Sequence, residues 1–166
     1  MITLVLGGAR SGKSDVAERL AGDLVPPVTY VATLEVGDDR DLAARVEQHR
    51  DRRPSSWRTV QAGLDLPAVL LALEGSVLVD SLGPWVSAAP GMDVDAGALC
   101  SALIERRGDT VVVSDEVGLS VHPATEDGRR FRDAVGTLNQ AVGLHADEVL
   151  LVVAGHTLRL DRPEAR

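Results

Sequence analysis

The amino-acid sequence predicts an α/β fold built on a mainly parallel sheet. Short apolar segments rich in β-branched residues alternate along the chain with segments of helical character. The apolar segments are almost continuous, which is typical of strands that are buried on both faces of a parallel sheet. Alternating strands and helices imply right-handed crossovers between parallel neighbours. The 166 residues suffice for one such domain and are too few for two ordinary domains.

The strands and helices can be placed along the chain in order. The predicted strands are 2–6, 28–33, 76–80, 110–114 and 148–153, with a short edge strand at 156–160. The predicted helices are 13–22, 42–53, 66–73, 95–107 and 128–144. Asp65 followed by Pro67 is typical of a capped helix start, and Pro54 ends the segment before it. We therefore expect one domain over residues 1–160 and a short tail over residues 161–166.

Composition narrows the class of protein. The formal net charge is −8, which argues against general binding to nucleic acid or to an anionic membrane surface. No apolar run approaches the roughly 20 residues of a membrane-spanning helix, and the N-terminus shows no secretion signal. The single cysteine, Cys100, excludes an internal disulfide and a cysteine-based zinc site. We expect a cytoplasmic protein with no membrane insertion.

A phosphate-binding sequence lies between the first predicted strand and the first predicted helix. Residues 7–14 fit the pattern G-x-x-x-x-G-K-[S/T], in the structural context that this motif requires. The predicted nucleotide-binding positions in it are Gly7, Gly8, Ala9, Arg10, Ser11, Gly12, Lys13 and Ser14. The loop amides and the helix N-terminus would bind a polyphosphate. Lys13, the only lysine in the chain, would reach the β- and γ-phosphates, and the Ser14 hydroxyl would ligate Mg²⁺.

A P-loop also needs an acidic residue at the end of another strand to hold the magnesium shell. Asp80 closes the predicted strand 76–80 and is the first choice. Asp115 and Glu116 follow the strand 110–114 and are the second. Carboxylates at these positions lie along the ligand-binding edge of an open α/β sheet.

A basic segment stands out in this acidic chain. Residues 45–58 contain five arginines against two acidic residues, with His49 among them. On a helix, Asp41, Arg45, His49 and Arg53 would form one row, because they are spaced by four. Guanidinium groups suit phosphate, and a neutral imidazole can attack phosphorus. The same pattern is also typical of a solvated basic helix, so the spacing alone leaves both interpretations open.

Seven blocks of sequence decide between them. They occur in the order GGARSGKS, YVAT, HRDRRPSSWRT, VLVDSLGPWV, SDEVGLSVHP, RRFRDAVGTLNQ and ADEVLLVVAG. Together they resemble the bifunctional adenosylcobinamide kinase / adenosylcobinamide-phosphate guanylyltransferase family of cobalamin biosynthesis, from residue 2 to about residue 160. The H-R-x-R-R-P-x-x-W block and the E-V-G…R-x-F-R-D…N-Q block are the specific ones. The resemblance implies a three-layer P-loop fold related to the RecA type, and a homotrimer.

The resemblance also implies a chemistry. In that family a histidine of the basic block, which aligns with His49, is guanylylated by GTP, and GMP then passes to the phosphorylated corrinoid. The implied reactions are phosphorylation of adenosylcobinamide by ATP or GTP with Mg²⁺, then formation of adenosylcobinamide-GDP and pyrophosphate. Lys13 and His49 are the expected catalytic residues. Further implied nucleotide contacts are Ala32, Thr33, Leu34, Arg50, Asp51, Arg52, Arg53, Gln61 and Asp80.

The chain departs from the family pattern at three places. Gln61 stands where the family often has a nucleotide-contacting Glu, and Asp115 stands where Asn is common. The stretch 86–97 is short and rich in small residues. These departures bear on nucleotide preference and corrinoid contacts more than on the phosphate chemistry.

The same residues are compatible with three other functions. One is a P-loop kinase for another small alcohol. A second is a GTPase-like switch, because residues 80–83 fit the pattern D-x-x-G. A chain with one lysine, in the P-loop, has no N-K-x-D guanine-reading motif, which argues against it. The third, a RecA-like nucleic-acid motor, lacks a basic groove with interleaved aromatic residues.

Overall fold

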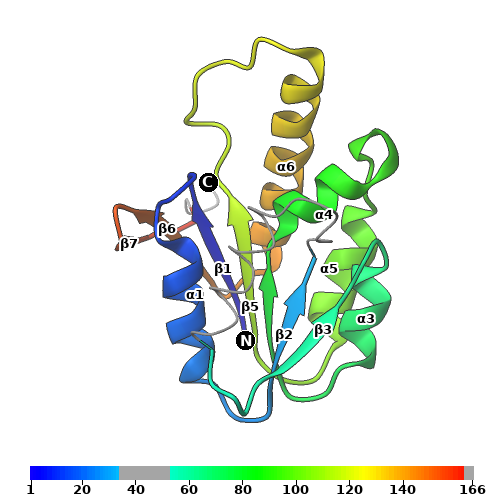
Figure 1. Cartoon of the computed structure of the whole chain (residues 1–166), viewed down its shortest axis with the longest axis vertical. Helices are drawn as coiled ribbons and strands as arrows, with labels where there is room; N and C mark the ends of the chain where they lie inside the picture. The colour runs from blue at the N-terminus through cyan, green and yellow to red at the C-terminus, as the bar shows by residue number, and fades with distance from the viewer. Residues whose placement is uncertain (34–52, 163–166) are drawn as a thin grey trace.

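A computed structural model of the chain describes residues 1–33 and 53–162. Its sheet has the strand order β3-β2-β4-β5-β1-β6-β7 (Figure 1). The strands are β1 (Ile2–Gly7), β2 (Val28–Ala32), β3 (Arg58–Gln61), β4 (Ser76–Asp80), β5 (Thr110–Asp115), β6 (Glu148–Val153) and β7 (His156–Arg159). The strand pairs are parallel except for β6 and β7, which pair antiparallel at one edge. The carboxyl ends of β1, β2, β4 and β5 therefore meet at one edge of the sheet.

Helices cover both faces of this sheet (Figure 1). They are α1 (Lys13–Gly22), α3 (Leu66–Ala72), α4 (Leu82–Ala88), α5 (Ala96–Glu105) and α6 (Glu126–His145), with a short 3-10 helix, η1 (Pro90–Met92). Helix α1 packs on one face, and α3, α4, α5 and α6 pack on the other. No helix within the described residues is both long and apolar enough to span a membrane.

The alternation of side chains along β5 shows why the strands are apolar throughout. Val111 and Val113 pack in the core beneath α1, whereas Val112 packs in the core beneath the other helices. All three are buried, since successive side chains of a strand point to opposite faces. The three-layer α/β P-loop fold predicted from the sequence is thereby confirmed.

The predicted elements agree with the observed ones, with small differences at the ends. Helix α6 begins at Glu126, two residues before its predicted start, because the Thr125 side chain accepts a hydrogen bond from Gly128 N at 3.1 Å. Asp65 does precede α3, but its side chain makes no capping hydrogen bond, contrary to expectation. Strand β3, helix α4 and the short 3-10 helix η1 were not predicted. The predicted helix 42–53 lies outside the described residues except for Arg53.

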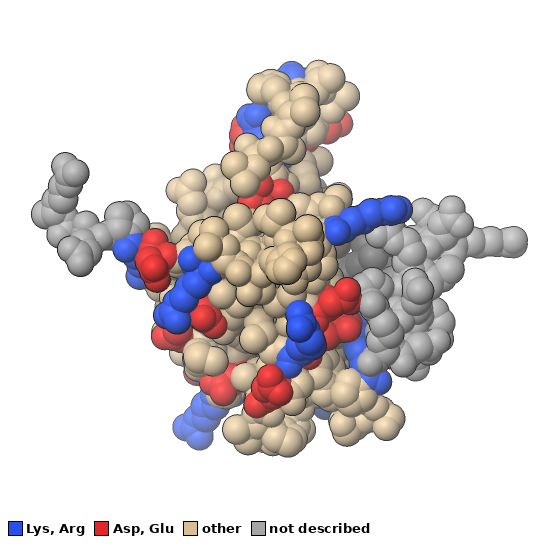
Figure 2. Space-filling view, turned by 90° about the vertical axis from the view of Figure 1, so that its left-hand side faces the viewer, with Lys and Arg blue, Asp and Glu red and all other residues tan. Residues whose placement is uncertain are grey.

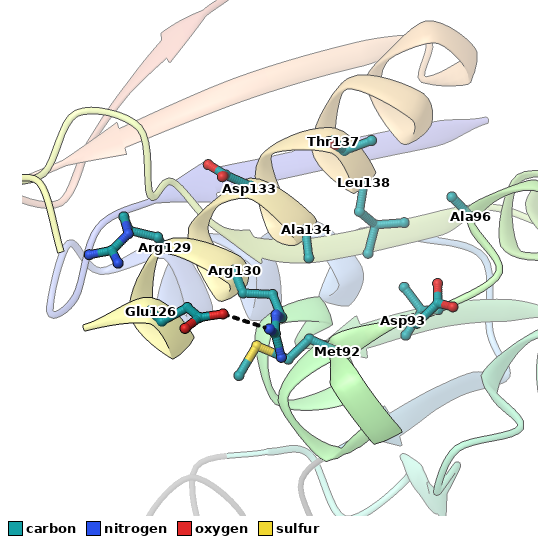
Figure 3. Close-up of a pocket in the computed structure, with 11 residues that line it drawn as sticks. Met92, Asp93, Ala96, Glu126, Arg129, Arg130, Asp133, Ala134, Thr137 and Leu138 are labelled. Atoms are coloured by element: carbon teal, nitrogen blue, oxygen red, sulfur yellow. Dashed lines mark hydrogen bonds and ion pairs between the residues drawn. The ribbon is translucent and has the colours of Figure 1, made fainter. Parts of the chain in front are cut away.

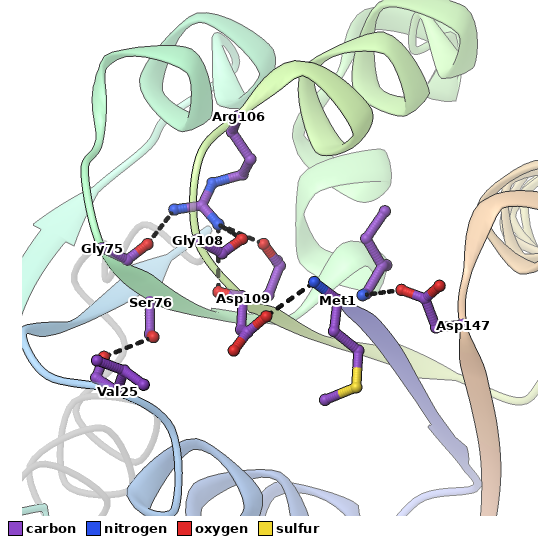
Figure 4. A network of polar contacts seen from close by, with 10 residues as sticks. Met1, Val25, Gly75, Ser76, Arg106, Gly108, Asp109 and Asp147 are labelled. Atoms are coloured by element: carbon purple, nitrogen blue, oxygen red, sulfur yellow. Dashed lines mark hydrogen bonds and ion pairs between the residues drawn. The ribbon is translucent and has the colours of Figure 1, made fainter.

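A buried arginine forms hydrogen bonds at the N-terminal ends of the central strands (Figure 4). Arg106, 7% exposed, donates from Nη1 to Gly108 O at 3.0 Å and from Nη2 to Gly75 O at 2.6 Å. Its Nη1 also reaches Thr110 Oγ1 at the start of β5. Nearby, the N-terminal amino group of Met1 lies 2.8 Å from Asp109 Oδ1. These contacts join the N-terminal ends of β1, β4 and β5. The polar network therefore lies at the end of the sheet opposite the P-loop and stabilises the fold there.

Candidate nucleotide-binding site

The glycine-rich loop makes a tight turn from β1 into α1. Gly12 has a φ of 91°, a left-handed conformation that glycine adopts without strain. Ser11 N donates to Gly8 O at 3.2 Å, and Gly155 N donates to Ser11 O at 2.8 Å. A Cβ on Gly12 would come within 3.3 Å of Gly155 Cα, so a side chain there would crowd the neighbouring turn. The loop backbone is thus held in place from both sides.

Lys13 lies where a P-loop lysine is expected, at the start of α1. Its Nζ donates to Gly8 O at 3.3 Å and forms an ion pair with Asp115 Oδ1 at 2.8 Å. The Lys13 side chain is only 14% exposed, so its ammonium is partly shielded from water. Gly7 and Asp115 are directly opposite each other in the β1–β5 pairing, which explains how Asp115 reaches the loop.

The structure brings together the two residues predicted first as magnesium ligands. Ser14 Oγ, in the first turn of α1, donates to Asp80 Oδ1 at 3.5 Å, and Asp80 ends β4. A hydroxyl and a carboxylate are the hard oxygen ligands that Mg²⁺ accepts. These two residues fit a magnesium site on the chemistry of their donor atoms.

The second-choice carboxylates are placed differently from each other. Asp115 is paired with Lys13, as described above. The Glu116 carboxylate accepts hydrogen bonds from Gly118 N at 2.8 Å and from Leu119 N at 3.0 Å. Glu116 therefore stabilises its own loop, and Asp115 is the member of the pair that lies against the P-loop.

Tyr30 is a site residue that the sequence reasoning missed. Its Oη donates to Asp80 Oδ2 at 2.9 Å. Burial raises the pKa of the Tyr30 phenol well above its ordinary value, and the Asp80 charge raises it further. Because the phenol stays protonated, Tyr30 holds one carboxylate oxygen of Asp80 and leaves the other toward Ser14. The position of Tyr30 could have indicated it as a site residue. It precedes the predicted nucleotide contact Ala32 by two residues and therefore lies on the same face of β2.

Tyr30 also connects Asp80 to the basic segment. The Arg53 guanidinium carbon lies 3.2 Å from the centre of the Tyr30 ring, a cation–π contact. Arg53 Nε is 3.5 Å from Glu18 Oε1 on α1, and the Arg53 side chain is 7% exposed. Arg53 is therefore anchored between α1 and β2. The predicted site residues His49, Leu34, Arg50, Asp51 and Arg52 lie outside the described residues.

The remaining predicted contacts lie along the same edge of the sheet. Ala32 pairs in register with Gln61 on one side and with Asp80 on the other. Thr33 is 1% exposed, and its hydroxyl donates to Ser81 O and accepts from Ser81 N at 3.1 Å. The Thr33 hydroxyl thus fixes the position of Ser81, which follows β4. Gln61, in contrast, is exposed to solvent.

One face of the molecule carries mixed charge. On the face shown in Figure 2, acidic and basic side chains are interspersed, and neither sign forms a continuous patch among the coloured residues.

A pocket of about 550 Å³ lies between α6 and the N-terminal end of α5. The ion pair between Glu126 and Arg130, 3.1 Å long, is part of its lining (Figure 3). The lining of this pocket includes no P-loop residue. It is separate from the phosphate-binding loop.

Fold and loop geometry define a P-loop protein, the class that binds nucleoside triphosphates. The family model described as cobinamide kinase / cobinamide phosphate guanyltransferase matches residues 3–160, and the chain belongs to that family. It is 40% identical over 164 residues to the bifunctional adenosylcobalamin biosynthesis protein CobP of Pseudomonas aeruginosa, covering 93% of this chain and 94% of the relative. It is 37% identical over 177 residues to CobU of Salmonella typhimurium, covering 93% of this chain and 97% of the relative.

Solved structures are similar in fold. An ATPase of the type III secretion system of pathogenic bacteria superposes with a TM-score of 0.56 at 9% sequence identity. The match covers 90% of this chain and 50% of that chain, so the present chain spans about half the length of the ATPase. At this identity the likeness concerns the fold alone.

Proposed function

We propose that the chain is a bifunctional enzyme that phosphorylates adenosylcobinamide and then transfers GMP to the product. The observation that carries this proposal is the family match over residues 3–160, with relatives of nearly the same extent. The P-loop geometry supports it, because Lys13, Ser14 and Asp80 gather where a triphosphate would be bound. Incubation with adenosylcobinamide and γ-labelled ATP or GTP, followed by separation of the corrinoids, tests the kinase step.

The first transfer uses the P-loop. The loop amides and the Lys13 ammonium would bind the β- and γ-phosphates, and Ser14 with Asp80 would hold Mg²⁺, which neutralises phosphate charge when bound. The acceptor hydroxyl then attacks the γ-phosphorus in line and loses its proton to water, the bond to the β–γ bridging oxygen breaks, and a nucleoside diphosphate leaves. The chain's own contribution is to position the triphosphate and to stabilise its charge.

The second transfer uses a covalent intermediate on His49. A neutral imidazole nitrogen attacks the α-phosphorus of GTP, the α–β bridging bond breaks, and pyrophosphate leaves. A phosphate oxygen of the corrinoid then attacks the same phosphorus, which releases His49 and forms adenosylcobinamide-GDP. Arginines of the basic segment would hold the displaced charge by bidentate hydrogen bonds.

Assembly and location belong to the same proposal. The family resemblance supports a homotrimer, and large apolar side chains on the described surface are consistent with contacts between copies, among them Val121 at 92% exposed and Leu119 at 81%. Light scattering during size-exclusion chromatography should give three times the 17.5 kDa chain mass. We propose that the enzyme acts in the cytoplasm.

Asp80→Asn is expected to weaken the dependence of the kinase step on Mg²⁺. The amide keeps the shape of the carboxylate but removes the charge beside Ser14 Oγ. We expect the Mg²⁺ concentration for half-maximal rate to rise by about tenfold or more, with the thermal melt unchanged. Asp65→Asn, on an exposed carboxylate outside the site, is the control. An unchanged magnesium titration in Asp80→Asn would transfer the metal role to Asp115 or Glu116.

Tyr30→Phe is expected to act through Asp80. The variant keeps the ring beneath Arg53 and removes the hydroxyl that donates to Asp80 Oδ2. We expect a rise of several-fold to about tenfold in the magnesium requirement, with a stability loss of about 1 kcal/mol. A stability loss without any change in the magnesium titration would show that Tyr30 is only structural.

A further inference from the structure

A second pocket lies on the side of the sheet away from α1, and one of its lining residues, Asp115, forms the ion pair with Lys13 of the P-loop. It lies between α4 and α6, has a volume of about 610 Å³, and is called the α4/α6 pocket below. Its lining includes Gly83, Ser87, Ala88, Met92, Asp115 and Phe131. The volume is in the range of small-molecule sites.

Asp115 connects this pocket to the phosphate-binding loop. Its carboxylate lines the pocket and also lies 2.8 Å from Lys13 Nζ. A Cβ added to Gly83 would collide with Asp115 Oδ2, so α4 packs directly against the carboxylate because residue 83 has no side chain. One carboxylate therefore separates the pocket from the lysine that would bind the β- and γ-phosphates.

The lining indicates what kind of group fits. Pro84, Ala88, Met92 and Phe131 offer carbon and sulfur surface, and Asp127 adds a second carboxylate from the first turn of α6. Among the residues that the structure describes, no lysine or arginine lines the pocket, so this lining is poorly suited to a phosphate. An apolar wall with carboxylates suits an uncharged arm that ends in a hydroxyl, which can donate to a carboxylate oxygen.

Position and lining together identify the occupant. In the kinase step the attacking hydroxyl must approach the γ-phosphorus in line, which requires the acceptor to lie next to the phosphates held by Lys13. We propose that the α4/α6 pocket binds the hydroxyl-bearing arm of the corrinoid acceptor and directs its hydroxyl past Asp115 toward the γ-phosphate. A pocket of this size holds the arm and leaves the macrocycle outside. The inference rests on the proposed kinase function and adds the acceptor subsite to it.

Ser87→Trp tests the proposal by filling the pocket. Ser87 is exposed on α4 and lines the pocket, so an indole there blocks the arm without entering the core. We expect the KM for adenosylcobinamide to rise by about tenfold or more, which corresponds to about 1.4 kcal/mol of lost binding. The KM for the nucleotide and the acceptor-independent labelling by α-labelled GTP should stay within about twofold of wild type. Ser101→Trp, at an exposed position of α5 outside the pocket, is the matched control.

Two further measurements keep the outcome decisive. Ala88→Trp should change the acceptor KM in the same direction, since Ala88 is also exposed and lines the pocket. Equilibrium dialysis, read from the visible absorbance of the corrinoid, should show the same weakening without turnover. Equal acceptor KM values in Ser87→Trp and Ser101→Trp would overturn the proposal, as would a rise in nucleotide KM alone. If the wild-type protein and the Ser101→Trp control both fail to phosphorylate the corrinoid, the proposed function itself is refuted. That outcome differs from failure of the pocket proposal, in which both proteins phosphorylate the corrinoid.

Discussion

Lys13→Ala should strongly reduce both phosphorylation of adenosylcobinamide and labelling by α-labelled GTP. Both reactions depend on a bound triphosphate, and Lys13 supplies a positive charge at the loop that we propose binds it. The Lys13 side chain is 14% exposed, so its charge acts in a partly dry environment where electrostatic stabilisation is strong. We expect a loss of about 10²–10³-fold in kcat for the kinase step, as for other preorganised electrostatic groups.

The matched control for this variant is Arg19→Ala. Arg19 is an exposed cation in the last turn of α1, so its removal changes the net charge by the same amount away from the P-loop. Turnover of Arg19→Ala should stay close to wild type. Circular dichroism melts of both variants separate loss of function from loss of fold. Near-normal turnover of Lys13→Ala in a folded protein would rule out the P-loop as the triphosphate site.

The features that the sequence predicted correctly are those set by local pattern. Strands β1, β4 and β5 lie at the centre of the sheet, so both of their faces are apolar, and a continuous apolar run identifies them. The P-loop is also local, since its conformation depends on glycines within eight residues. Asp80 could be selected because the end of a parallel strand lies on the ligand-binding edge.

The missed strand β3 and the missed helix α4 lack that pattern. Strand β3 is an edge strand in which Arg58, Thr59 and Gln61 are exposed, so its sequence shows no buried run. Helix α4 has seven residues and contains Gly83 and Pro84, which weaken helical character in a sequence reading. Its position is decided by tertiary contact, because Trp85 is buried and donates from Nε1 to Leu64 O at 2.9 Å.

The contacts within the site could not be predicted from the sequence for a different reason. The Lys13–Asp115 pair and the Tyr30–Asp80 hydrogen bond join residues far apart in the sequence. Such pairs follow from strand order and register, which the sequence pattern does not define. Asp115 shows the consequence. The sequence offered Asp115 only as a second-choice magnesium ligand, whereas its ion pair with Lys13 and its place in the pocket lining connect the P-loop to the α4/α6 pocket.

His49 is the residue whose removal should separate the two activities. Kinase chemistry requires in-line attack by a substrate hydroxyl on the γ-phosphorus, with charge stabilisation that we assign to Lys13, Ser14 and Mg²⁺. Guanylyl transfer through the enzyme requires a nucleophile at the α-phosphorus with pyrophosphate as leaving group. The proposed role of His49 belongs to the second reaction and has no counterpart in the first.

His49→Ala is therefore expected to reduce GMP labelling and adenosylcobinamide-GDP formation to background while adenosylcobinamide phosphorylation stays measurable. His156→Ala, which removes an exposed histidine of β7, is the matched control and should label like wild type. The wild-type label should be released by acid and resist base, because a phosphoramidate on imidazole is acid-labile. Label uptake by His49→Ala would show that another residue is the nucleophile. A wild-type protein that phosphorylates the corrinoid but never takes up label would be a kinase that lacks the covalent guanylyl step, because nothing in the first transfer requires GMP to be attached to the enzyme.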